Sequence, residues 1–214
     1  MSTPAVAIIP FGPLERAKTR LGATLSAVQR QTLAVAMLHD CITALSAATT
    51  VGRIVVVGPM SNKRHLVLPV GATYQLEGKP TLNGAVAVMV RAVPVGTPVL
   101  VIHADLPLLT AGDIDAFVTG TPASGVALAA AADGGTPAIC CTMGTVWQWQ
   151  FGPHSFRLHH DAAKTAGIPV VVERSSTVTT DVDTPEDLAA LDPARCGIQT
   201  AAFLKTLHPN TLKR

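Results

Sequence analysis

Short runs of β-branched and apolar residues alternate with longer segments of helical periodicity along almost the whole chain of 214 residues. Strands that are separated by helices pair as parallel neighbours joined by crossovers. Such crossovers are right-handed, which places helices on both faces of the sheet. The expected strands are 5–10, 53–57, 72–76, 98–103, 125–132, 138–143 and 168–173. We therefore predict an α/β fold with a mostly parallel, doubly wound sheet.

Capping residues locate several helix starts. Ser26, followed by Gln29, forms the pattern of a capping box. Thr110 stands directly before a helical segment, as an N-cap does. Thr184 and Pro185 mark another start, because proline is favoured at the first helical position. The expected helices are 26–45, 82–93, 110–118, 155–166, one that begins after 184 and, with a weaker signal, 198–207.

The composition narrows the class of protein. Apolar residues make up 48% of the chain and aromatic residues only 4%, so Ala, Val, Leu and Ile must build the core. A net charge of +2, with no run of Lys and Arg before the short tail Lys213-Arg214, argues against a nucleic-acid partner. No stretch approaches eighteen consecutive apolar residues, so we expect no membrane partner. We expect a single domain over 1–214, with 193–214 as a tail, and a homodimer stays open.

The start of the chain and the cysteines indicate the compartment. Residues 1–9 lack a basic leader and a cleavage site and lead directly into a strand, so we expect a cytoplasmic protein. None of the four cysteines forms a C-x-x-C motif, and the adjacent Cys140 and Cys141 would point to opposite faces of a strand. We expect buried, reduced thiols rather than a metal site or a disulfide.

Asp181-Val182-Asp183 stands directly before a helix start. Two carboxylates at i and i+2 of an extended segment point to the same side and could reach one divalent cation. We expect this segment to end a strand, which would place both acids at the carboxyl edge of the sheet. Ligands bind at that edge in open α/β sheets. The alternative is a solvated turn with surface acids.

Two further loops at this edge carry groups suited to phosphate chemistry. The loop after the first strand holds Arg16, Lys18 and Arg20, which could neutralise a polyphosphate. Asp105, in the motif D-L-P at the end of strand 98–103, could share a metal ion with the two acids. Mg²⁺ suits such hard carboxylate oxygens and nucleotide phosphates. A solvated basic loop and an ordinary turn are the alternatives.

The segment F-G-P-H-S-F at 151–156 forms a third candidate loop. We expect Ser155 to be a helix N-cap, and the N–H groups behind it could accept a phosphate or a carboxylate. Pure helix capping is the alternative. His103 lies in an apolar run and is expected to be a core histidine with satisfied hydrogen bonds. His159 and His160 cannot face the same way on a helix, so no metal site is expected there.

Known motifs of other enzyme classes are missing from the sequence. No G-x-x-x-x-G-K-[ST] occurs, which argues against a P-loop, and no G-x-G-x-x-G follows a strand, which argues against a dinucleotide dehydrogenase. No Ser/His/Asp or Cys/His set stands in a recognisable context, so covalent nucleophilic catalysis lacks support.

Six motifs occur in one order over nearly the whole chain: A-K-T-R-L (17–21), L-N-G-A (82–85), D-L-P (105–107), D-G-G-T (133–136), F-G-P-H-S-F (151–156) and D-V-D-T-P-E-D (181–187). In this combination the chain resembles the 2-phospholactate guanylyltransferase family of coenzyme F-420 biosynthesis, within the nucleotidyltransferases of the molybdenum-cofactor guanylyltransferase type. The resemblance implies a Rossmann-like, GT-A-like nucleotidyltransferase fold. It also implies transfer of GMP from GTP to 2-phospho-L-lactate, phosphoenolpyruvate or 3-phospho-D-glycerate, with Mg²⁺ and release of pyrophosphate.

The resemblance also implies roles for individual residues. The metal ligands would be Asp105, Asp181 and Asp183. The catalytic groups would be Lys18, Arg20 and Asp105, with the two cations on the triphosphate. The nucleotide would be bound by Pro10, Gly12, Lys18, Leu82, Asn83, Ala85 and Asp105, among which Asn83 is the polar candidate for the guanine. The acid would be bound by Thr136, Pro137, Gly152 and Ser155.

Two departures from the family pattern fall in the acid pocket. The first loop commonly reads V-K-P, and here it is Phe11-Gly12-Pro13. The family usually has Asn or Thr after D-G-G-T, and here Pro137 offers neither a side-chain donor nor a backbone N–H. Because Gly12 would open space for a bulkier acid, we expect 3-phospho-D-glycerate to be favoured. Two other readings stay open: a nucleotidyltransferase for a sugar phosphate or molybdopterin, and a non-catalytic nucleotide-binding protein.

Overall fold

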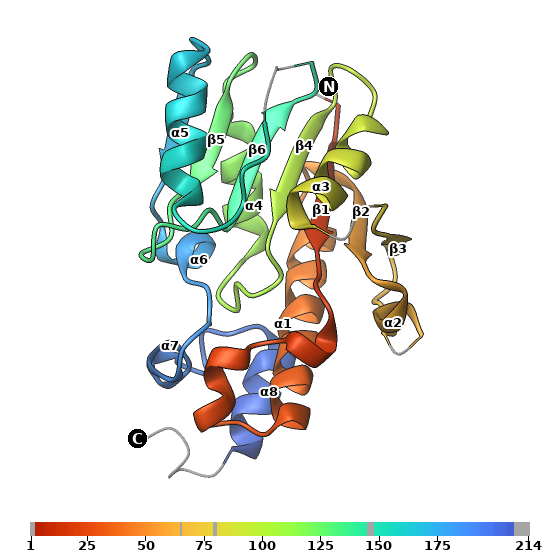
Figure 1. Ribbon diagram of the computed structural model, residues 1–214, viewed down its shortest axis with the longest axis vertical. Helices are drawn as coiled ribbons and strands as arrows, with labels where there is room; N and C mark the ends of the chain where they lie inside the picture. The colour runs from red at the N-terminus through yellow and green to blue at the C-terminus, as the bar shows by residue number, and fades with distance from the viewer. Residues whose placement is uncertain (1–2, 65, 79–80, 145–147, 208–214) are drawn as a thin grey trace.

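The computed structural model describes residues 3–64, 66–78, 81–144 and 148–207, and a seven-stranded sheet forms its main layer (Figure 1). The strands lie in the order β3-β2-β1-β4-β6-β5-β7. Their bounds are β1 Ala5–Pro10, β2 Val51–Gly58, β3 Ala72–Leu76, β4 Pro98–Ile102, β5 Val126–Ala129, β6 Ala138–Thr142 and β7 Val170–Glu173. Each strand predicted between residues 5 and 173 is present, with ends shifted by a few residues.

The sheet is parallel except at β6, which runs antiparallel to both β4 and β5. The connection between β5 and β6 holds the turn at 133–136 and no helix, so the chain reverses direction there instead of crossing over. β7 then pairs with β5 in parallel after a helical crossover. The predicted α/β fold with a mostly parallel sheet is confirmed.

The α-helices are α1 Ala27–Ala47, α2 Met60–Lys63, α3 Leu82–Arg91, α4 Ala111–Thr119, α5 Ser155–Thr165, α6 Ser176–Thr179, α7 Pro185–Ala190 and α8 Ile198–Thr206, and two 3-10 turns are η1 Leu14–Arg16 and η2 Thr19–Ala23. Ser26, Thr110 and Thr184 each begin a helix with a complete capping box, as expected for Ser26 with Gln29. The N-cap prediction for Ser155 was wrong. His154, with a left-handed φ of 58°, is the N-cap, and Ser155 is the first helical residue.

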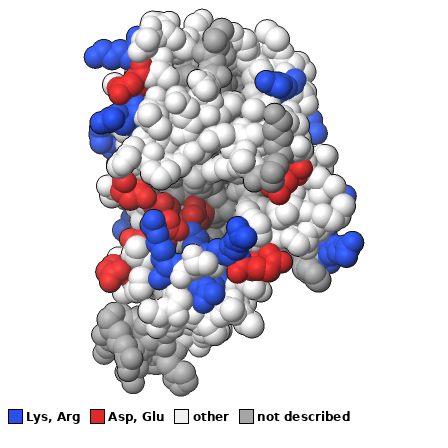
Figure 2. Space-filling view, in the orientation of Figure 1, with Lys and Arg blue, Asp and Glu red and all other residues white. Residues whose placement is uncertain are grey.

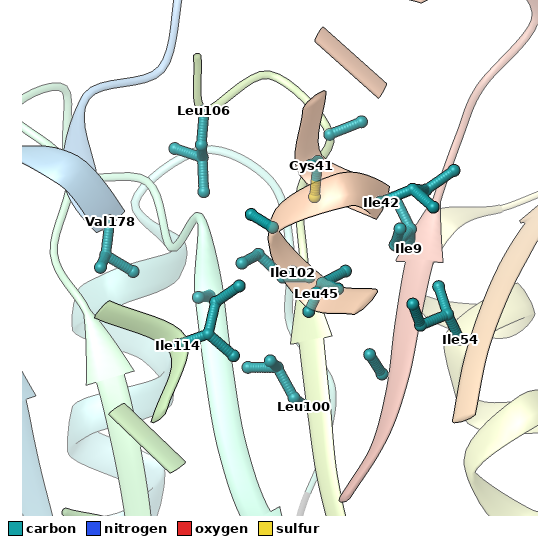
Figure 3. Close-up of a cluster of buried hydrophobic side chains, with 14 of the residues drawn as sticks. Ile9, Cys41, Ile42, Leu45, Ile54, Leu100, Ile102, Leu106, Ile114 and Val178 are labelled. Atoms are coloured by element: carbon teal, nitrogen blue, oxygen red, sulfur yellow. The ribbon is translucent and has the colours of Figure 1, made fainter. Parts of the chain in front are cut away.

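Helices cover both faces of the sheet. Helices α1 and α4 pack with Ile9 and Leu100 on one face, whereas α3 and α5 pack with Ile8 and Val101 on the other. Figure 3 shows α1 side chains over β1 and β4 in the first of these layers. The adjacent Cys140 and Cys141 belong to opposite layers, and both are free thiols, as predicted. We call the sheet with these covering helices the sheet body.

A separate apolar cluster lies below the sheet, where η2, α7 and α8 gather around the start of α1 (Figure 1). We call residues 18–25, 33–37 and 181–207 the helical base. Its buried side chains include Leu21, Leu33, Met37, Val182, Leu188 and Phe203. The weakly predicted helix at 198–207 is present as α8, and residues 208–214 of the predicted tail lie outside the described residues.

An acid from α1 fixes the position of α8. The Asp40 carboxylate accepts the N–H groups of Gln199 and Thr200 at 2.9 and 2.7 Å. Gly197 lies so close that a Cβ atom there would stand 2.2 Å from Asp40 Cγ.

No described helix is long and apolar enough to cross a membrane.

The placement of Asp181-Val182-Asp183 at a strand end was wrong. Strand β7 ends at Glu173, the short helix α6 follows, and residues 181–183 form a loop. Val182 is fully buried in the helical base, so the loop is held by the packing of this side chain. Asp181 and Asp183 flank this buried valine, and both are only partly buried.

Candidate active site

Lys18 lies between two of the predicted acids. Its Nζ donates to Asp105 Oδ2 at 2.5 Å and to Asp183 Oδ1 at 2.8 Å. Asp105 follows β4 in the sheet body, whereas Asp183 lies in the helical base. Lys18 has a left-handed backbone, with φ 49°, where the chain passes from η1 into η2. One buried ammonium group thus joins the two regions of the molecule.

Lys18 and Asp105 stabilise each other in their charged forms. Burial lowers the pKa of Lys18, but the carboxylates of Asp105 and Asp183 outweigh this effect, so its pKa lies above the ordinary value. Burial also raises the pKa of Asp105, but the Lys18 ammonium reverses that shift and the pKa lies below the ordinary value. The ion pair is therefore fully charged at neutral pH.

Asp181 adds negative charge beside this pair. Its pKa is raised to about 6, first by burial and then by the charges of Asp105, Asp183 and Asp133. Asp105 Oδ1 is buried and has no hydrogen-bond partner among the described residues. The site therefore carries an uncompensated acceptor oxygen and more negative charge than Lys18 alone balances.

The carboxylates of Asp105, Asp181 and Asp183 are the type of ligand that a hard cation prefers, although they are not arranged around a common point. No group of three His, Cys, Asp or Glu side chains in the described part of the chain is arranged to hold a metal ion. Lys18 lies between Asp105 and Asp183 instead. The unpartnered Asp105 oxygen and the raised pKa of Asp181 fit the carboxylate environment that Mg²⁺ prefers.

A cavity of about 320 Å³ opens beside Lys18, where Figure 2 shows acidic and basic side chains around a hollow in this face. Its lining includes Pro10, Gly12, Met37, Leu82, His103 and Asp105. A neighbouring hollow is lined by Arg16, Lys18, Thr19, Arg20 and Asp183. Arg20 is exposed, and its Nη1 lies 3.8 Å from Asp183 Oδ2. A largely apolar cavity with a cationic extension suits a nucleoside with attached phosphates.

Five of the predicted nucleotide residues border this cavity, and two do not. Pro10, Gly12, Lys18, Leu82 and Asp105 line it. The Asn83 amide is occupied by the backbone of Phe151, since Oδ1 accepts its N–H at 2.7 Å and Nδ2 donates to its carbonyl at 3.0 Å. Ala85 is buried against the sheet. Successive residues of a helix point in different directions, and α3 presents only Leu82 to the cavity.

The predicted acid-binding residues form a second group beside β6. Thr136 Oγ1 and Ser155 Oγ lie 3.0 Å apart, and both residues are buried. Gly152 has a φ of 137°, which favours glycine, in an exposed turn before α5. Pro137 contributes its carbonyl, which accepts the His103 N–H at 2.8 Å. The structure brings Thr136 and Ser155 into direct contact.

His103 connects the two groups, and its prediction as a satisfied core histidine was wrong. Its Nε2 is buried and has no hydrogen-bond partner among the described residues, and the side chain lines the cavity. Its ring lies 5.4 Å from the ring of Phe151. The position two residues before Asp105 at a strand end was the signal that could have identified it.

No sequence pattern singled out Asn62, and His159 was considered only as a metal ligand. Asn62 is buried; its Nδ2 donates to the Gly12 carbonyl at 2.9 Å and its Oδ1 accepts the Leu14 N–H at 3.1 Å. It therefore holds the loop that lines the cavity. His159 contacts Thr136. These partners are distant in the sequence, so no local pattern indicated them.

Comparisons with known proteins show which family the chain is similar to. The family model described as Guanylyl transferase CofC like matches residues 5–211. Phosphoenolpyruvate guanylyltransferase of Roseiflexus sp. (strain RS-1) is 36% identical over 184 residues, which are 85% of this chain and 82% of that protein. 3-Phospho-D-glycerate guanylyltransferase of Phenylobacterium zucineum (strain HLK1) is 32% identical over 198 residues, which are 89% and 91% of the two chains.

A solved structure supports the fold. A protein from Desulfovibrio desulfuricans G20, named provisionally as a nucleotide-diphospho-sugar transferase, superposes with a TM-score of 0.80 at 16% identity, covering 99% of this chain and 97% of that chain. The nucleotidyltransferase fold implied by the motifs is therefore confirmed. Because the family model spans nearly the whole chain and two relatives exceed 30% identity, this chain belongs to the family of CofC-like guanylyltransferases.

Proposed function

We propose that the enzyme joins GMP from GTP to the phosphate of a small phosphorylated acid, with 3-phospho-D-glycerate favoured, in coenzyme F-420 biosynthesis. One observation carries the proposal: Lys18 is held between Asp105 and Asp183 at a cavity with a cationic extension. Phosphoryl and nucleotidyl transfers need positioned charges more than covalent chemistry. The site supplies such charges without a covalent nucleophile.

In this proposal, different residues around the cavity bind different parts of the nucleotide. The apolar lining near Leu82 and Met37 takes the guanosine. Lys18 and Arg20 face the triphosphate and stabilise the charge that develops as pyrophosphate leaves. Asn62 keeps the loop at 11–14 in place through its two backbone hydrogen bonds. An oxygen of the acid's phosphate forms a bond to the α-phosphorus while the α–β anhydride bond breaks.

Asp105, Asp181 and Asp183 would hold Mg²⁺. When bound, the ion neutralises charge on the phosphates and on the departing pyrophosphate. The Asp181 carboxyl, with its pKa of about 6, is mostly ionised at neutral pH and is available as a ligand. Lys18 keeps the pKa of Asp105 below its ordinary value, so this carboxylate is also ionised at neutral pH.

The acid would bind between Thr136, Gly152 and Ser155. A Cβ atom at Gly12 would have no neighbour within 4 Å, so the chain leaves open space at the position where the family commonly carries a lysine. This space supports the preference for 3-phospho-D-glycerate over the smaller phosphoenolpyruvate. Gly12→Val should raise the KM for 3-phospho-D-glycerate more than the KM for phosphoenolpyruvate.

The test is a mass-spectrometric product assay with mixed nucleotides and mixed phosphorylated acids in the presence of Mg²⁺. We expect the GMP adduct of 3-phospho-D-glycerate as the main product. Good turnover with 2-phospho-L-lactate and none with 3-phospho-D-glycerate would remove the acid preference. If only sugar phosphates gave products, the proposed nucleotide donor would stand, and the proposed phosphorylated-acid acceptor would be wrong.

A pair of variants tests the catalytic role of the acids. Asp183→Asn should reduce pyrophosphate release at least about a hundredfold, the size typical for loss of one electrostatic group in an active site. Asp161→Asn is the control, because this exposed acid on α5 lies away from the cavity. Unchanged release of pyrophosphate by Asp183→Asn would contradict the catalytic proposal.

A further inference from the structure

Three buried polar side chains form a continuous chain of hydrogen bonds beside the predicted acid site. His159 is fully buried, and Thr136 and Ser155 are each 2% exposed. The Gln150 backbone N–H donates to His159 Nε2 at 2.8 Å. His159 Nδ1 lies 3.2 Å from Thr136 Oγ1, which lies 3.0 Å from Ser155 Oγ. The chain therefore runs from a backbone amide to a hydroxyl in the first turn of α5.

The backbone amide fixes the direction of every bond in this chain. An amide N–H can only donate, so His159 Nε2 must accept and carries no hydrogen. The neutral imidazole then carries its hydrogen on Nδ1 and donates to Thr136 Oγ1. Burial lowers the pKa of His159 to about 4, which keeps the ring neutral.

The remaining hydrogens follow from the same rule. With His159 as the donor, Ser155 Oγ is the acceptor within reach for the Thr136 hydroxyl hydrogen among the described residues. Ser155 Oγ thus accepts from Thr136, and its own hydrogen has no other acceptor in the described part of the chain. A buried hydroxyl with an unused hydrogen is suited to an incoming acceptor.

We propose that His159 is a positioning residue that turns the Ser155 hydroxyl into a hydrogen-bond donor for an anionic oxygen of the phosphorylated acid. The inference rests on the proposed function, because it needs an anion at Ser155. Gly152, Pro153 and His154, which precede Ser155, are exposed, so the acid can approach from that side. The opposite tautomer of His159 would reverse the direction of these hydrogen bonds, and Ser155 would then present oxygen lone pairs to a negatively charged substrate.

Two variants of His159 separate this role from simple packing. Asparagine places an amide nitrogen near the position of Nδ1 and preserves the donor to Thr136. Glutamine places its amide group near the position of Nε2 and preserves the partner of Gln150, but it loses that donor. If the ring only filled space, asparagine would be the worse replacement, because it removes more atoms.

The experiment measures KM and kcat for the acid and for GTP with the full-length protein. His159→Gln should raise the KM for the acid about tenfold with little change in the KM for GTP, and His159→Asn should keep most of the affinity. Thr136→Val should match His159→Gln, and Thr136→Ser should recover binding. A larger loss for asparagine than for glutamine would overturn the inference.

A second measurement does not depend on turnover. The ring ¹⁵N signals of His159, identified by their loss in His159→Asn, should show a protonated Nδ1 and an unprotonated Nε2 at neutral pH. A hydrogen on Nε2, or a charged ring, would overturn the inference even if the enzyme is active. Absence of turnover by the native protein with every acid, together with the expected ring signals, would instead contradict the proposed function.

Discussion

The sheet body contributes Asp105, Thr136 and Ser155 to the site, whereas the helical base contributes Lys18, Asp181 and Asp183. In the sheet body, regular alternation along the chain determines which residues are buried. In the helical base, residues from three distant segments meet around Val182, and their packing determines where the charges lie. The acids of this site therefore depend on two separate cores, one built on the sheet and one built from segments that are distant in the sequence.

Removal of the lysine that joins the two regions should have the largest effect. Lys18→Met removes the cation that lies between Asp105 and Asp183, and it removes a charge from the phosphate site. We expect kcat/KM to fall about 10²- to 10³-fold. Lys18→Arg should retain more activity, because it keeps the charge. A loss of less than tenfold in Lys18→Met would contradict the central role of this ion pair.

Two glycines compare the packing of the regions directly. At Gly197, a Cβ atom would overlap Asp40, so Gly197→Ala should destabilise the protein by about 1–3 kcal/mol. At Gly112 in α4, the nearest atom would be 3.9 Å away, and Gly112→Ala should be neutral or stabilise by up to about 1 kcal/mol. Urea unfolding of both variants gives the free energies. Equal effects would show that the helical base accommodates a Cβ atom at Gly197 without strain.

Acidification should affect the two regions in opposite directions. His159 in the sheet body has a pKa of about 4 when folded, below its ordinary value of 6.5. The unfolded chain therefore binds more protons between these values, and stability is lost as the pH falls through this window, by roughly 2 kcal/mol from pH 7 to 5. His159→Asn should remove this contribution.

The contribution of Asp181, in the helical base, to the pH dependence of stability has the opposite sign. Its pKa is raised to about 6 from an ordinary value of 3.8, so the folded protein binds more protons between these values. Its contribution to stability therefore rises as the pH falls from about 6 toward 4. Asp181→Asn should steepen the loss of stability of the native protein on acidification, and urea unfolding at several pH values measures both slopes. Parallel curves for both variants would contradict the assignment.

The smallest effect is expected at Arg20. Its guanidinium is exposed, and its 3.8 Å contact with Asp183 is a surface ion pair, which contributes at most about 1 kcal/mol. Arg20→Gln should leave the free energy of unfolding almost unchanged and raise the KM for GTP severalfold, since the cation faces the proposed phosphate site. Isothermal titration with a non-hydrolysable GTP analogue measures the affinity. A large loss of stability would show that Arg20 supports the base instead.

Much of the sheet body could be predicted from the sequence. Strand β2 contains a continuous β-branched run at 54–57, and the caps at Ser26, Thr110 and Thr184 are local patterns that the structure reproduces. The strand order could not be predicted in the same way. The insertion of β6 between β4 and β5 depends on contacts between distant segments.

The site was predictable as a set of residue types but not as a set of contacts. The pattern of charges identified Lys18, Asp105 and Asp183 as members of one site, although no local signal indicated that the lysine lies between the acids. The Asn83 amide bonds to the backbone of Phe151, 68 residues away, a contact that no local pattern indicated. His103 was misassigned because an apolar neighbourhood in the sequence does not reveal an unpartnered ring nitrogen.

The burial of Val182 has a consequence for measurements on the intact protein. Its side chain packs in one cluster with side chains of α7 and α8, and Asp181 and Asp183 flank it in the chain. A ligand that contacts these acids and Asp105 together can bind only while both cores are assembled. Its binding free energy is therefore added to the cost of detaching α7 and α8, so saturation with the ligand should slow amide hydrogen exchange in α8, remote from the cavity itself.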